Sequence, residues 1–98
     1  MPNIYKYFGI VIYFWSNEHN PIHVHAEYNG AVVKISFTMK EGKITRTTYE
    51  KDSGEFPPAK LKDLKDFIKT YKYNIVDKWC DYFVRNITPK CMNITIKV

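Results

Sequence analysis

The chain has 98 residues, a length that suits one compact domain and excludes two domains of ordinary size. With 45% hydrophobic and 16% aromatic residues it can build a core, which argues against wholesale disorder. Its 15 Lys and Arg residues against 10 Asp and Glu residues give a net charge of +5, which suits either an anionic partner or a solubilising surface.

No apolar run approaches the roughly 20 residues that a membrane-spanning helix needs, and the N-terminus lacks a signal-peptide cleavage pattern. We therefore expect a cytoplasmic protein with reduced thiols and no membrane partner. Cys80 and Cys91 do not form a Cys-x-x-Cys pair, so a thiolate zinc site has no support. Nucleotide-cradling and serine-hydrolase motifs are absent as well, and we expect no cofactor.

The first half of the chain is expected to form strands. Its segments are β-branched and aromatic or alternate between apolar and polar residues. Asn29-Gly30 is a strong two-residue hairpin signal, and residues 40–42 provide a second tight connection. The predicted strands cover residues 8–16, 22–28, 31–39 and 43–50 and form an antiparallel meander.

The second half is expected to form two helices within residues 58–87. Pro58 suits a first helical turn, and Leu61 and Leu64 begin an apolar stripe at helical spacing. Asn74 could cap a second helix after a kink, and Pro89 would stop it.

Residues 92–98 alternate and predict a short terminal strand, which could add to the sheet of a second copy and form a homodimer. The expected fold class is α+β in a single domain, residues 1–98. An antiparallel sheet of about four strands (about 8–50) would be covered on one face by two helices (about 58–87), followed by the terminal strand (about 92–98).

All three histidines of the chain lie within seven positions: His19, His23 and His25. Because successive side chains of a strand point to opposite faces, His23, His25 and Glu27 should share one face. That face would be solvated or part of a cleft, and His19 could fold back towards it from the preceding loop. The other face, expected to pack under the helices, carries Val24, Ala26 and Tyr28.

Several uses of the histidine face stay open. His23, His25 and Glu27 could bind a divalent metal. Alternatively, His23 and His25 could exchange protons with an RNA phosphodiester, with Glu27 orienting one imidazole and Lys34 or a helix lysine holding phosphate. The face could instead contact a partner protein, or its histidines could simply hydrogen-bond their neighbours on an ordinary sheet.

At these residues the chain resembles a small prokaryotic family known as domain of unknown function 4160. The family has Asp, Pro and Phe where this chain has Glu18, Ile22 and Val24, and every histidine is kept. The later "GEFPPAKLKDLKDFI" is similar to the family's Gly-Glu-Leu-Pro entry into a helix, so the resemblance covers about residues 1–85. The matching positions in the first 30 residues are Met1, Pro2, Gly9, Ile10, His19, Pro21, His23, His25, Ala26, Tyr28 and Gly30.

Members of that family are often encoded beside a second small protein, and the pair is regarded as a candidate toxin–antitoxin module. The resemblance therefore implies a toxin-like component that acts on RNA or translation, with a small cognate antitoxin-like protein as partner. His19, His23, His25 and Glu27 would be the candidate catalytic residues, and a ribonuclease-like activity the form of the chemistry. The alternatives are a non-catalytic protein-binding module or a small metal-binding domain.

Overall fold

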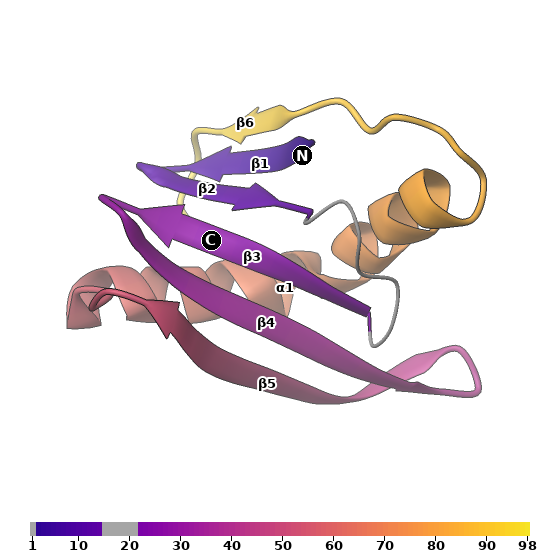
Figure 1. Cartoon of the computed structure of the whole chain (residues 1–98), viewed down its shortest axis with the longest axis horizontal. Coiled ribbons are helices and arrows are strands. Elements are labelled where there is room, and N and C mark those ends of the chain that lie inside the picture. Colours follow the sequence, from indigo (N-terminus) through magenta and orange to yellow (C-terminus); the bar gives the residue numbers. More distant parts are fainter. Residues whose placement is uncertain (1, 15–21) are drawn as a thin grey trace.

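The structure is a computed structural model that describes residues 2–14 and 22–98. In these ranges it is an α+β fold, a mixed sheet of six strands with one long helix behind it (Figure 1). The strands lie in the order β5-β4-β3-β2-β1-β6, the first five as an antiparallel meander and β6 parallel to β1. The elements are β1 (Asn3–Tyr7), β2 (Ile10–Tyr13), β3 (Ile22–Tyr28), β4 (Ala31–Lys40), β5 (Lys43–Ser53), α1 (Pro58–Phe83) and β6 (Met92–Ile94).

Within the described residues, three two-residue turns join neighbouring strands, and both residues of each turn have positive φ. This conformation matches the right-handed twist of paired strands, which is why Asn-Gly is favoured there. The predicted hairpin at Asn29-Gly30 is therefore confirmed, and so is the tight connection after β4. The turns are Phe8-Gly9, Asn29-Gly30 and Glu41-Gly42.

The prediction of one strand over residues 8–16 is wrong at its start, because the chain reverses at Phe8-Gly9 and forms β1 before it. Phe8 has φ of 46°, a conformation that bulky residues rarely adopt, so the sequence carries little sign of this turn. The Nζ of Lys60 on α1 donates a hydrogen bond of 2.8 Å to the carbonyl of Phe8. A contact between distant segments thus holds the turn.

The prediction of two helices is also wrong, since α1 runs without a break through Asn74. Pro58 begins the helix as expected, but the helix ends at Phe83 rather than near residue 87. Asn74 is exposed, and the helical spacing of apolar residues continues past it, so one continuous helix buries the whole stripe against the sheet. The buried residues of α1 are Leu64, Phe67, Ile68, Ile75, Val76 and Trp79.

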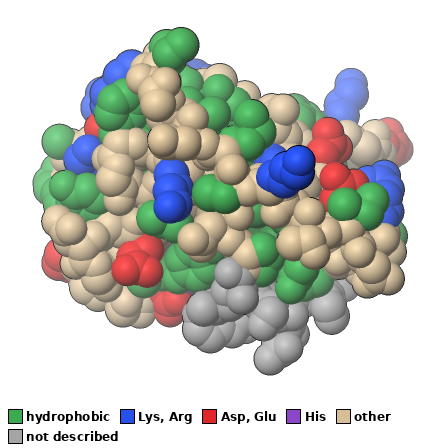
Figure 2. Space-filling view, turned by 90° about the horizontal axis from the view of Figure 1, so that it is seen from above, with side chains coloured by type: hydrophobic (Ala, Val, Ile, Leu, Met, Phe, Trp, Pro, Cys, Tyr) green, Lys and Arg blue, Asp and Glu red, His purple; other side chains and the backbone are tan. Residues whose placement is uncertain are grey.

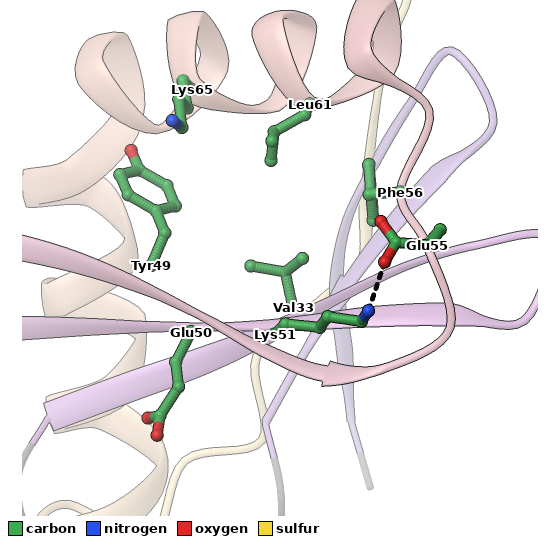
Figure 3. Close-up of a pocket in the computed structure, with 8 residues that line it drawn as sticks. All are labelled: Val33, Tyr49, Glu50, Lys51, Glu55, Phe56, Leu61 and Lys65. Atoms are coloured by element: carbon green, nitrogen blue, oxygen red, sulfur yellow. Dashed lines mark hydrogen bonds and ion pairs between the residues drawn. The ribbon is translucent and has the colours of Figure 1, made fainter.

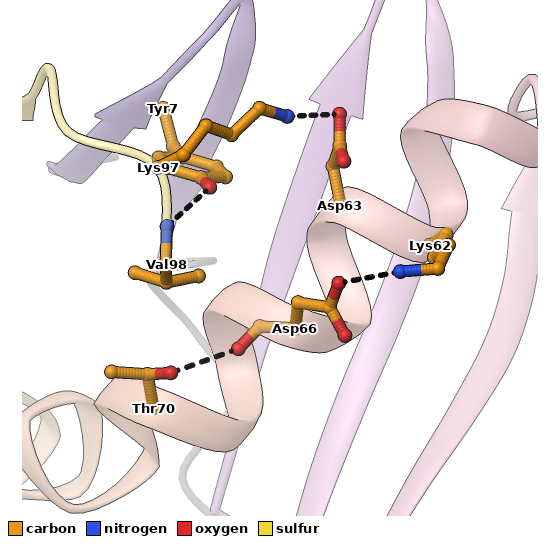
Figure 4. Close-up of polar contacts among 7 residues, drawn as sticks. All are labelled: Tyr7, Lys62, Asp63, Asp66, Thr70, Lys97 and Val98. Carbon is orange, nitrogen blue, oxygen red and sulfur yellow. Dashed lines mark hydrogen bonds and ion pairs between the residues drawn. The ribbon is translucent and has the colours of Figure 1, made fainter.

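The C-terminal segment is anchored to its own chain. Only residues 92–94 form a strand, and they pair with β1 of the same molecule. Beyond it, the Nζ of Lys97 lies 2.8 Å from a carboxylate oxygen of Asp63 on α1, and the N–H of Val98 donates to the hydroxyl of Tyr7 at 3.1 Å (Figure 4). The hydrogen bond from Lys97 lowers the pKa of Asp63. A homodimer through this strand stays a prediction.

The molecule seen from its β6 side carries hydrophobic side chains interspersed with basic and some acidic ones (Figure 2). In the C-terminal segment, Met92 is 49% exposed and Ile96 is 78% exposed. The terminal segment therefore closes the β1 edge of the sheet without adding much to the core.

The ring of Tyr5 lies in the core and supplies a prediction for alkaline pH. Burial raises the pKa of Tyr5 to about 12, with smaller contributions from Tyr71 and Asp77. The folded protein keeps this proton where the unfolded chain loses it, near pH 10. The contribution of this group to the free energy of unfolding is therefore fully present below about pH 10. It is lost, by roughly 2 to 3 kcal/mol, as pH rises to about 12.

Urea unfolding between about pH 9 and pH 12 measures this loss. Tyr5→Phe keeps the ring and removes the proton, so its stability should fall less steeply over the same range. An unchanged slope would contradict the assignment.

Candidate functional site

His23 and His25 project from the face of the sheet that α1 does not cover. They alternate on β3 with Val24 and Ala26, which are fully buried beneath the helix, as predicted. The expectation that the two imidazoles share a side is confirmed. His19 lies outside the described residues.

The expectation that this side is accessible at the imidazoles is wrong, because His23 is 2% exposed and His25 is 6% exposed. Their neighbours account for part of the burial. Tyr13 lies opposite His25 in the β2–β3 register and stacks on it, with ring centroids 5.6 Å apart and planes 21° apart. The ring of His23 meets that of His25 edge-on at 5.4 Å. The two histidines are thus part of a packed layer of rings.

The carboxylate recorded at His25 belongs to Asp52 on β5. One carboxylate oxygen of Asp52 lies 3.6 Å from Nε2 of His25, and the Asp52 side chain is 55% exposed while that of His25 is 7% exposed. The sequence predicted that a different carboxylate, that of Glu27, would orient one of the imidazoles. Burial raises the pKa of Tyr13, and the charges of Glu27 and Asp52 raise it further, so both carboxylates act on the same group of rings.

Asp52 reaches His25 through an irregularity in the sheet. In the β4–β5 ladder Val33 pairs with Lys51 and Val32 pairs with Ser53, so Asp52 is the extra residue of a β-bulge. Bulges bend a strand and re-aim a side chain, and they are frequent beside active sites. The bulge therefore turns a residue of an edge strand towards an imidazole two strands away.

A polar cavity of about 170 Å³ lies beside this pair, lined by Lys34, Glu50, Lys51 and Asp52. Lys34 stands between His25 and Glu50 in the strand registers, which places all three side chains on the same face. We call this surface the histidine face: Tyr13, His23, His25, Lys34, Glu50 and Asp52.

The sequence analysis predicted that Lys34 or a lysine of the helix would hold a phosphate, and the structure corrects part of this prediction. Lys34 lies on the histidine face, as that prediction requires. The lysines of α1 cannot serve, because the helix packs on the opposite face of the sheet (Figure 1). Sequence reasoning missed Asp52, Glu50 and Tyr13, since their place depends on strand registers.

Within residues 2–14 and 22–98, no group of three His, Cys, Asp or Glu side chains is arranged to hold a metal ion. No helix in this part of the chain has the length and apolar character needed to cross a membrane.

The fold and the histidine face define a small α+β domain with a strand-borne histidine pair next to a bulge carboxylate. The chain belongs to the family described as domain of unknown function (DUF4160), whose model matches residues 9–80. The match includes β2 to β5 and most of α1 and leaves β1 and β6 outside. No curated protein and no solved structure matches the chain.

Proposed function

We propose that the protein is the toxin-like component of a two-protein module, that it acts on RNA or translation in the cytoplasm, and that the histidine face is its working surface. The observation that carries the proposal is the His25–Asp52 pair, set by a β-bulge at the edge of a polar cavity that also contains Lys34.

A carboxylate beside an imidazole orients the ring and stabilises its protonated form. In the proposal His25 therefore transfers a proton to or from a reacting phosphodiester, and Asp52 positions it. The ammonium of Lys34 in the cavity supplies positive charge for the phosphate oxygens. His23, almost fully buried against His25, positions that ring and does not contact the substrate.

The low exposure of His25 limits what can reach it. A cavity of about 170 Å³ suits a phosphate group better than a nucleobase, so the substrate is addressed through its backbone. The net charge of +5 favours the approach of such a polyanion. A small antitoxin-like partner would then act by covering the histidine face.

The test is inducible expression in a bacterium, with growth as the readout. Wild type is expected to slow growth, and His25→Ala and Asp52→Asn are each expected to relieve the effect by about tenfold or more. Asp52→Asn is the sharper variant, because the Asp52 side chain is exposed and its loss spares the core.

Glu41→Gln, in the turn between β4 and β5, changes an exposed carboxylate at the other end of the hairpin and should behave as wild type. Circular dichroism confirms that each variant is folded. The catalytic proposal fails if wild type leaves growth unchanged, or if both folded site variants slow growth as strongly as wild type. The latter result favours the non-catalytic binding module.

A further inference from the structure

A second cavity, of about 250 Å³, lies between the β4–β5 hairpin and the N-terminal half of α1 (Figure 3). It opens on the helix-covered side of the sheet and shares only Glu50 and Lys51 of β5 with the polar cavity on the histidine face. Glu50, which also borders it, points away to the other side of β5 (Figure 3). Its lining residues are Val33, Tyr49, Glu50, Lys51, Glu55, Phe56, Leu61 and Lys65.

The floor of this cavity is apolar. Val33 is 7% exposed and Phe56 is 8% exposed, and both belong to the core, while Leu61 packs against it from α1. Small-molecule sites typically combine such an apolar floor with a few polar groups that fix orientation. An apolar cavity of roughly 150 Å³ already accepts benzene, so this one has room for a single aromatic ring with a short substituent.

The polar groups at the rim select the charge of the occupant. The Nζ of Lys65 lies 5.2 Å from the ring centroid of Tyr49. Lys51 and Glu55 neutralise each other in an ion pair at the opposite end. Among the ion pairs of the described residues, none involves Lys65, which leaves one positive charge uncompensated at the rim. Burial raises the pKa of Tyr49, so its hydroxyl stays protonated and can donate a hydrogen bond.

We propose that this cavity binds a small aromatic monocarboxylate, with the ring on Val33, Phe56 and Leu61 and the carboxylate at Lys65 and the Tyr49 hydroxyl. One uncompensated cation calls for one negative charge on the ligand. The site is independent of the proposed function, because it lies across the sheet from His25.

The experiment is a titration of the ¹⁵N-labelled protein with phenylacetate, followed by NMR shifts of cavity amides. About ten non-hydrogen atoms in a site of this kind predict a dissociation constant on the order of 1 mM. Lys65→Gln should weaken binding at least about fivefold, because it removes the charge-assisted contact. Lys69→Gln, an exposed lysine one turn further along α1, is the matched control and should bind as wild type.

Phenylethylamine, which keeps the ring and reverses the charge, should give no shifts at the same concentrations. The proposal is overturned if phenylacetate leaves the cavity amides unshifted, if Lys65→Gln binds it as tightly as wild type, or if the amine binds equally well.

Discussion

Replacing Phe67 by alanine is expected to lower the free energy of unfolding by about 4 kcal/mol, in the middle of the range for buried phenylalanines. Phe67 is 0% exposed. Its ring centroid lies 4.5 Å from that of Tyr71, 4.7 Å from that of Tyr7 and 5.3 Å from that of Tyr5. Tyr71 lies on α1, and Tyr5 and Tyr7 lie on β1. These rings cannot fill the space left by the Phe67 ring unless the helix or the strand moves.

Urea unfolding followed by circular dichroism measures this change. Lys69→Ala, on the exposed side of the same helix, serves as control and should stay within about 0.5 kcal/mol of wild type. Since domains of this size are stable by only about 5 to 15 kcal/mol, Phe67→Ala should remove a quarter or more of the total stability. A loss below about 1 kcal/mol would show that the ring cluster is not the centre of the core.

Replacing Asn74 by proline is expected to cost about 3 kcal/mol or more, because proline in a helix interior removes a backbone hydrogen bond and clashes with the preceding turn. Asn74 is exposed in the middle of α1, so the cost comes from the backbone rather than from lost packing. Equilibrium urea unfolding of the variant provides the measurement.

The sign of the stability change caused by Asn74→Ala distinguishes one continuous helix from two helices. In a continuous helix alanine is the better helix former and should raise stability by roughly 0.5 kcal/mol. If Asn74 capped a separate second helix, the same change would instead cost about 1 kcal/mol. A destabilised Asn74→Ala together with a tolerated Asn74→Pro would contradict the continuous helix.

The error at Asn74 shows how a local signal loses to a longer one. Asparagine favours a helix start because its side chain bonds free backbone N–H groups. The apolar stripe from Leu64 to Trp79 keeps its helical spacing across this position, and burying it in one piece requires no new helix end. The sequence contained both signals, and the burial of the whole stripe prevails.

The carboxylate at His25 could not have been found by counting along the hairpin. Near the turn Lys40 pairs with Lys43. If this register continued along the hairpin without a bulge, Tyr49 would stand opposite Lys34. A first bulge between Thr38 and Met39 shifts the ladder by one, so Glu50 stands there instead. A one-residue shift moves every later side chain to the other face, and Asp52 is then the extra residue of a second bulge.

The sequence by itself determined the parts that depend on neighbours along the chain. These are the alternation that places His23 and His25 on one side, the Asn29-Gly30 turn, the start of the helix at Pro58 and its apolar stripe. Only the tertiary structure decided that the imidazoles are buried and that Asp52 meets His25. Sheet register, bulges and the pairing of β6 with β1 join residues far apart in the sequence, and their energies come from packing that no short segment contains.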